Sequence, residues 1–311
     1  MQIFRHYENL PADVKGSAVA IGNFDGIHLG HQAVIREAGR IAHDAGIPWA
    51  VLTFEPHPRE VFKPDGEPFR LTPFRIKTRQ IEELGVDALF VLHFDPEFAK
   101  LSADAFIKNV LIGGLAARHV VSGYDFVFGN KRAGNCELLL HKGKEEGFDF
   151  TCVSAVDDGE KIYSSTRVRK YLAAADPVSA AAVLGRPFEI EGRVEKGDQR
   201  GRTIGFPTAN LALGDYLQPA RGVYAVRAGI DDGVDTVWRD GVANLGVRPT
   251  FDGEGLVLEV HLFDFDGDLY NRHLRVALVD YLRPEQKFDG LDALKTQIAA
   301  DGEQARVILA G

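Results

Sequence analysis

The ten residues GNFDGIHLGH, from Gly22 to His31, constrain this chain more than any other stretch. They follow the apolar run 17–21, which predicts a buried strand, and they lead into a helical pattern that begins at Gln32. A glycine-rich turn between a strand and a helix start is a phosphate site in many α/β proteins, because backbone N–H groups and the positive helix end point at the anion. The stretch therefore predicts a nucleotide-binding turn in an α/β fold.

The turn also carries two histidines. His28 and His31 are three residues apart and share one side of the first helical turn, and Gly30 leaves room for a ligand between them. A metal pair or two solvated helix caps is the alternative for such a pattern on its own. The turn has neither the Gly-Lys-Ser/Thr of a P-loop nor the G-x-G-x-x-G of dinucleotide folds. It resembles the H-x-G-H signature of the nucleotidyltransferase superfamily, whose members move a nucleotidyl group and release pyrophosphate.

Length and composition bound the class of protein. The 311 residues allow two domains of about 100–200 residues each. No apolar run approaches the roughly 20 residues of a membrane span, and the N-terminus has no signal-peptide pattern. Cys136 and Cys152 lack metal-like spacing, which favours a reduced cytoplasmic protein. The net charge of −9, with no basic excess in either half, argues against a nucleic-acid binder.

The first half alternates strand and helix patterns. Helices between successive predicted strands imply a parallel sheet that is covered by helices on both faces. With the strand order 3-2-1-4-5, the loops after the first and fourth strands meet at the point where ligands bind in such sheets. The loop after the fourth strand, Gly123–Arg132, is polar, aromatic and basic together, as a nucleotide or flavin pocket requires. The predicted strands are 17–22, 48–54, 87–93, 117–122 and 149–153.

Three further segments follow predicted strands or start helices. Thr72-Pro73 predicts an N-cap and a first helical residue. The prolines of TFEPHP stiffen a loop at the carboxyl edge of the sheet, where His57 is either a ligand-side or a structural histidine. The hydroxyls and arginines of residues 164–169 make an anion cradle, with a capping serine and solvated arginines as the alternative.

Together the segments GNFDGIHLGHQ, TFEPHP, GYDFVFG and SSTRVR resemble the FMN adenylyltransferase module of prokaryotic bifunctional FAD synthetases. The resemblance implies a Rossmann-like nucleotidyltransferase domain over residues 1–185. In that domain His28 and His31 are the catalytic residues that contact ATP phosphates, and Pro56, His57 and Pro58 lie nearer the flavin. The resemblance also implies nucleotide-binding roles for Gly22, Phe24, Asp25, Gly30, Asp125, Ser164, Thr166 and Arg169.

From Arg186 the periodicity changes to short alternating strands separated by Gly-, Asp- and Pro-rich turns. This pattern predicts a closed antiparallel β-barrel over residues 186–311, with a terminal helix from Leu291. A short helix from Asp176-Pro177 to Gly185 is expected to connect the two halves. The predicted barrel strands are 188–195, 222–229, 237–245, 256–265 and 273–281.

Three residues of the barrel stand out for their chemistry. Thr208 and Asn210 present neutral oxygens on one face if extended, and such oxygens suit Mg²⁺ shared with phosphates. A turn stabilised by these side chains is the alternative. Glu259 lies on the face of its strand away from the apolar layer, where it is either a solvated carboxylate or a general base.

This half resembles riboflavin kinase, the second module of the same bifunctional family, through GRVEKGDQRGRTIGFPTAN, RGVYAV, GVANLGVRPTF, LEVHLFDFDGDLY and LRPEQKF. The resemblance implies Mg²⁺ on Thr208 and Asn210, and Glu259 as the base for the riboflavin 5′-hydroxyl. Asn271 stands where the family usually has glycine. ATP phosphates are expected on the glycine-rich loop, with Gly192, Lys196, Gly197 and Gly201.

The expected function is flavin cofactor synthesis in two steps. ATP phosphorylates riboflavin to FMN, and a second ATP adenylylates FMN to FAD with release of pyrophosphate. One alternative is an FMN adenylyltransferase with a non-catalytic flavin-binding barrel; the acidic balance disfavours an RNA-binding one. A second is an adenylyltransferase for another substrate. We expect no nucleic-acid or membrane partner, and self-association stays open.

Overall fold

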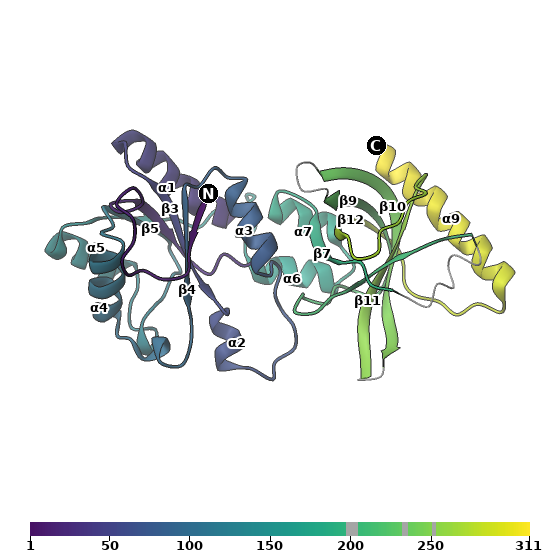
Figure 1. Cartoon of the computed structure of the whole chain (residues 1–311), viewed down its shortest axis with the longest axis horizontal. Coiled ribbons are helices and arrows are strands. Elements are labelled where there is room, and N and C mark those ends of the chain that lie inside the picture. Colours follow the sequence, from purple (N-terminus) through teal and green to yellow (C-terminus); the bar gives the residue numbers. More distant parts are fainter. Residues whose placement is uncertain (197–204, 232–235, 251–252) are drawn as a thin grey trace. The chain divides into compact units, whose positions relative to one another are not determined.

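The computed structural model describes residues 1–196, 205–231, 236–250 and 253–311 (Figure 1). The chain forms two compact units. The first contains Met1–Glu67 and Thr72–Ser164, and the second contains Pro68–Leu71 and Ser165–Gly311. The units thus meet in the sequence at Ser164, ahead of the expected connecting helix. The functional division into residues 1–185 and 186–311 stays a prediction.

The first unit is built on a six-stranded parallel sheet with the order β1-β4-β3-β2-β5-β6. The last five positions are the expected order 3-2-1-4-5, so the loops after β2 and β5 leave adjacent strands at the same edge. The edge strand β1 was not predicted, because three mostly exposed residues carry no apolar pattern. The strands are β1 (Gln2–Phe4), β2 (Ala18–Ile21), β3 (Trp49–Glu55), β4 (Ala88–His93), β5 (His119–Gly123) and β6 (Asp149–Val153).

Helices cover both faces of this sheet, as expected. Alternate strand residues enter two separate cores: Ala20 and Val51 pack with α1 and α3, whereas Val19 and Leu52 pack with the helices of the opposite face. One layer holds α1 (Leu29–Ala45) and α3 (Phe74–Glu82). The other holds α4 (Ala103–Phe106), η2 (Ile107–Gly114) and α5 (Cys136–Glu146). The short elements α2 (Pro58–Phe62), η1 (Phe98–Lys100) and η3 (Asn130–Arg132) lie in connections.

The second unit is an antiparallel sheet with the order β7-β12-β9-β10-β11-β8. A bridge between Glu195, just past β7, and Asn210 on β8 joins the two ends of this order, which confirms the predicted barrel. Strand β8 was not predicted, because Asn210 interrupts its four-residue apolar run, whereas the equally short β2 is apolar throughout. The strands are β7 (Phe188–Arg193), β8 (Ala209–Ala212), β9 (Gly222–Asp231), β10 (Thr236–Thr250), β11 (Gly253–Leu262) and β12 (His273–Arg283).

The described part of the second unit also contains the helices α6 (Ser165–Ala173), α7 (Pro177–Leu184) and α9 (Leu291–Ala310). Helix α7 starts and ends as expected, with Asp176 accepting from the Ser179 N–H at 2.9 Å and Gly185 at φ 75°. It packs against β7 and β12. Helix α9 covers β9 and β10 through Ala305 and Leu309 (Figure 1).

Candidate active sites

The turn after β2 is compact because its backbone uses conformations that few residues tolerate. The Gly22 N–H donates to the Leu52 carbonyl at 3.1 Å, and a Cβ at Gly22 would lie 2.9 Å from the Phe24 ring. Phe24 has φ 49° and Gly26 has φ 90°, both in the left-handed region. Phe24 is fully buried and meets the His31 ring edge-on, with centroids 5.4 Å apart. The turn therefore sets the position of the second histidine through Phe24.

His28 and His31 lie in direct contact at the start of α1. His28 is the N-cap, and its Nδ1 accepts the His31 backbone N–H at 3.3 Å. The two rings stack with centroids 3.6 Å apart. A neutral imidazole whose Nδ1 accepts carries its proton on Nε2, so His28 presents an Nε2–H donor.

The stacked rings correct one expectation. Because they touch, a ligand does not lie between His28 and His31. A Cβ at Gly30 would lie 3.2 Å from the His28 ring, so Gly30 makes room for that ring.

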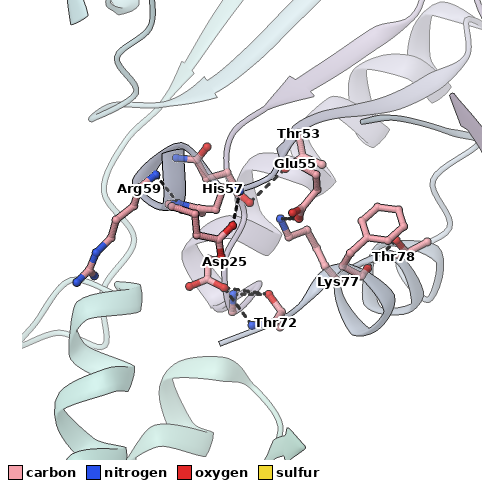
Figure 2. Close-up of polar contacts among 12 residues, drawn as sticks. Asp25, Thr53, Glu55, His57, Arg59, Thr72, Lys77 and Thr78 are labelled. Carbon is pink, nitrogen blue, oxygen red and sulfur yellow. Dashed lines mark hydrogen bonds and ion pairs between the residues drawn. The ribbon is translucent and has the colours of Figure 1, made fainter. Parts of the chain in front are cut away.

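Asp25 and Thr72 fasten the turn to the segment before α3 (Figure 2). Asp25 is buried and its Oδ1 accepts the Thr72 N–H at 3.0 Å, while Thr72 Oγ1 accepts the Gly26 N–H at 2.8 Å. The prediction that Thr72 caps α3 is wrong: Pro73 is the N-cap and makes no side-chain bond. The Thr72 hydroxyl instead accepts from Gly26 in the turn after β2. Asp25, through its bond with the Thr72 N–H, therefore helps to hold the shape of that turn.

A buried ion pair that the sequence reasoning missed stands at the end of β3. Lys77 Nζ on α3 donates to Glu55 Oε1 at 2.7 Å, and the Lys77 side chain is completely buried (Figure 2). The available signal was the position of Lys77 on the apolar stripe of α3, between Phe74 and Ile81. The pair fixes the strand end from which the TFEPHP loop leaves.

His57 in that loop serves as a helix cap. Its Nδ1 accepts the Arg59 N–H at 3.1 Å, and its own N–H donates to Glu60 Oε2 at 2.9 Å, which forms a capping box for α2. Pro56 follows a cis peptide bond and Pro58 is the first residue of α2. These contacts support the structural role of His57. A role of these three residues toward the flavin stays a prediction.

The loop after β5 contains Asp125, which is exposed. The Tyr124 N–H donates to the Val153 carbonyl at 2.9 Å, which holds the loop to the end of β6. A Cβ at Gly123 would lie 3.8 Å from Val34 on α1. The start of this loop therefore lies beside the helix that carries the histidines, as expected for a shared site at the order reversal.

The SSTRVR segment is divided between the units. Ser164 ends the first unit, whereas Thr166 and Arg169 lie on α6 in the second. Arg169 Nε donates to the Phe69 carbonyl at 3.0 Å, and its guanidinium lies over the Phe69 ring at 5.5 Å. Thr166 is exposed. Phosphate binding by these three residues stays a prediction.

In the barrel, three polar residues form a row across neighbouring strands. Glu259 on β11 is opposite Asn210 on β8 and, on its other side, opposite Asn244 on β10. Directly opposed residues share a face of a sheet. The neighbours Leu258 and Val260 are buried on the other face, which confirms the expected alternation around Glu259. Asn244 was missed, although an amide inside the apolar run GVANLGV was a readable signal.

The Asn210 side chain has the features of a ligand-binding group. Its Oδ1 is buried and has no hydrogen-bond partner anywhere in the described parts of the chain. Such an unsatisfied group costs about 1–3 kcal/mol, so a bound ligand there is favoured. The preceding Pro207 carbonyl accepts from His261 Nδ1 at 2.9 Å, which holds Thr208, itself half-buried, at the start of β8. Amide and hydroxyl oxygens fit Mg²⁺.

The remaining barrel predictions fall partly within the described residues. Gly192 pairs with Leu274 inside β7, and a Cβ there would make only ordinary contact with Leu211 at 3.5 Å. Lys196 is exposed beyond β7. Asn271 has φ 60°, a conformation that Asn tolerates better than most residues. Gly197 and Gly201 lie outside the described residues.

Comparison with known proteins agrees with both halves. The FAD synthetase family model matches residues 10–167, and the riboflavin kinase family model matches residues 184–309. A bifunctional riboflavin kinase/FMN adenylyltransferase of Pseudomonas fluorescens is 45% identical, covering 100% of this chain and 98% of its own. The chain belongs to the family of bifunctional riboflavin kinase/FMN adenylyltransferases. Relatives with the same description in Escherichia coli K12 and Bacillus subtilis are 44% and 41% identical and cover 98% and 93% of this chain, and 97% and 91% of their own.

A solved structure has the same fold over almost the whole chain. It is described as a macrolide-efflux protein from Streptococcus pneumoniae, is 33% identical, covers 98% of both chains and gives a TM-score of 0.85. In the described part of this chain, no helix has the length and apolar character needed to cross a membrane.

Proposed function

We propose that this chain makes FAD from riboflavin in two ATP-dependent steps, one in each half. The barrel phosphorylates riboflavin to FMN, and the parallel-sheet half adenylylates FMN and releases pyrophosphate. The single observation that carries the kinase step, over a non-catalytic flavin-binding barrel, is the cross-strand pair of Glu259 and Asn210. A flavin carrier has no use for a carboxylate beside a buried, unsatisfied amide oxygen.

In the kinase step Glu259 accepts the proton of the riboflavin 5′-hydroxyl as its oxygen bonds to the γ-phosphorus of ATP. The bond from that phosphorus to the β,γ-bridging oxygen breaks, and ADP leaves. Thr208 and Asn210 would hold Mg²⁺ together with ATP phosphates, and the ion would supply neutralisation of the phosphate charge. Asn210 Oδ1 supports this assignment because it is buried without a protein partner among the residues described.

In the adenylyl step a phosphate oxygen of FMN bonds to the α-phosphorus of ATP, and the bond to the bridging oxygen breaks to release pyrophosphate. The nucleophile is already an anion, so no general base is needed. His28 donates from Nε2–H, and His31 and the N–H groups at the start of α1 lie beside it. We assign these donors to the phosphates, whose charge they stabilise in the transition state.

The functional boundary lies near Gly185, so that residues 1–185 perform adenylyl transfer and residues 186–311 perform phosphorylation. A cytoplasmic location is supported by the two cysteines, which are free thiols in the structure.

The direct test is chromatography of flavins after incubation of the full chain with riboflavin, ATP and MgCl₂. Riboflavin should be converted to FMN and then to FAD, and FMN supplied alone should give FAD. A non-catalytic barrel predicts FAD from FMN but no product from riboflavin. An adenylyltransferase for another substrate predicts that FMN is not consumed.

A further inference from the structure

The chain's two cysteines meet in space. Cys136 is the first residue of α5 and Cys152 lies on β6. Their sulfur atoms are 2.8 Å apart, with the Cys152 thiol donating to Cys136. A disulfide bond is about 2.05 Å long, so the covalent bond requires only a small further approach of the two atoms. The sequence spacing gave no reason to expect this contact.

The pair is attached to the loop that starts the predicted nucleotide site. The Cys136 thiol donates to the Gly123 carbonyl at 3.3 Å, and its sulfur lies 3.9 Å from the Tyr124 carbonyl. Asp125 follows directly. Partial burial, the hydrogen bond with Cys136 and the charges of Cys136 and Asp125 raise the pKa of the Cys152 thiol to about 12.

Both cysteines have solvent-accessible surface. Cys152 is exposed and lies on β6, the edge strand of the sheet, and Cys136 is half-buried. Exposed thiols of this kind can react with small molecules, whereas cysteines buried in a core are inert.

We propose that Cys136 and Cys152 are a modification site that forms a reversible internal disulfide, and that this bond slows FMN adenylylation while riboflavin phosphorylation continues. The effect on activity rests on the proposed function of the parallel-sheet half. Oxidation removes both thiol hydrogens, so the Gly123 carbonyl loses the Cys136 donor and keeps the Phe126 N–H at 3.1 Å and the Ser122 hydroxyl at 3.3 Å. The loop with Asp125 thereby loses one of its attachments. The barrel contains no cysteine.

The oxidant is a low-molecular-weight disulfide, RSSR. The Cys136 sulfur, as thiolate, attacks one sulfur of RSSR, forms a mixed disulfide and releases RS⁻, which takes up a proton. The Cys152 sulfur then loses its proton, attacks the Cys136 sulfur and releases the second RS⁻, which is protonated in turn. Two electrons pass from the two thiols to RSSR, and two RSH molecules result. A dithiol such as dithiothreitol reverses the exchange.

The test treats the full chain with oxidised glutathione and measures intact mass, peptide maps and both activities. We expect a mass loss of two hydrogen atoms and a cross-linked Cys136–Cys152 peptide. FAD formation from FMN should fall by about two- to tenfold, the range for losing one weak hydrogen bond at a site. FMN formation from riboflavin should be unchanged, and dithiothreitol should restore FAD formation.

Cys152→Ser is the matched control, because it keeps a donor to Cys136 and cannot form the bond. In this variant oxidised glutathione should form no internal cross-link, so the cross-link-dependent, reversible loss of FAD formation should be absent. Two free thiols after treatment, or glutathione adducts without the internal bond, overturn the proposed modification. A cross-linked protein with unchanged FAD formation, or with equal loss of both activities, overturns the link to the adenylyl site. If the reduced protein makes no FAD, the proposed function fails, and the mass measurement still decides the modification.

Discussion

Asn210 on β8 and Glu259 on β11 are direct cross-strand partners in the barrel. This register places an amide oxygen and a carboxylate on the same face, away from the layer of Leu211 and Leu258. A slip of one residue would move Glu259 into that apolar layer, so the core itself fixes the pair. Packing on one face of the sheet thereby sets the chemistry on the other.

Glu259→Gln should remove FMN formation, because the amide cannot accept the hydroxyl proton. A general base contributes about 10²–10⁴ in rate, and a loss in this range is expected. FAD formation from supplied FMN should continue. Glu303→Gln, the same change at an exposed position on α9, is the control and should leave both rates alone. An unaltered kinase rate in Glu259→Gln would identify Glu259 as a solvated strand residue.

Changes at Thr208 and Asn210 should act through the metal. Asn210→Asp adds a charge beside the proposed Mg²⁺ and should shift the Mg²⁺ concentration needed for half-maximal FMN formation. Thr208→Ala should weaken Mg²⁺-dependent ATP use in the kinase step alone. Both are checked by titrating FMN formation with MgCl₂. Identical titrations in the variants and the parent would mean that these residues only stabilise a turn.

The cap and the proposed phosphate contact of His28 can be tested separately, because its Nδ1 caps α1 and the proposed donor is the other ring nitrogen, Nε2. His28→Ala removes both, whereas His28→Asn keeps a side chain that caps helices well. Both should lower FAD formation by about 10²–10³, the usual loss for one preorganised donor, and only His28→Ala should also destabilise the fold.

The readouts are FAD formation and urea unfolding, with His43→Asn at the exposed end of α1 as control. FMN formation from riboflavin should persist in every variant. Full FAD synthesis in His28→Asn would reduce His28 to a helix cap.

Local patterns predicted much of this fold. The cap Asp176 and the stop at Gly185 set the ends of α7, as the sequence indicated. Two short strands were not predicted, because β1 has three mostly exposed residues and the four residues of β8 include the polar Asn210. Thr72 was misassigned because its nearest helix suggested a cap, whereas its hydroxyl bonds to Gly26 far back in the chain.

In the candidate site, too, contacts between separate elements could not be predicted from local sequence patterns. The motif located His28 and His31 but not their stacking, which depends on the backbone of Phe24 and Gly30. The burial of Lys77 follows from the packing of α3 on the sheet. Its partner Glu55 lies on a different element, and no local pattern joins the two.

The Glu55–Lys77 ion pair gives a stability prediction. Glu55→Gln removes the carboxylate that lies 2.7 Å from the buried Lys77 ammonium and should lower the free energy of unfolding by about 3–5 kcal/mol. Lys77→Met should also destabilise. The double variant Glu55→Leu/Lys77→Met should lose less than the sum of the single variants, because no unpaired charge remains. Urea unfolding at neutral pH measures all three, and strictly additive losses would rule out the coupling.

The two units of the fold suggest an experiment with separate fragments of the chain. Ala180, Val183 and Leu184 of α7 are buried, and α7 packs against β7 and β12, so a fragment that starts at residue 186 loses part of its core. Residues 165–311 should therefore melt at a higher temperature than residues 186–311 in circular dichroism. Both fragments, where folded, should convert riboflavin to FMN and never to FAD, because neither contains the histidine turn.

Residues 1–185 should make FAD from FMN and leave riboflavin untouched. This N-terminal fragment keeps Pro68–Leu71, whose Arg70 forms an isolated β-bridge with Tyr216 in the full chain, so that segment loses its bridge partner. Slower FAD formation than in the full chain is the expected result. Equal melting temperatures for the two barrel fragments would remove α7 from the barrel core. FAD made by a barrel fragment, or FMN made by residues 1–185, would contradict the division of the two reactions between the halves.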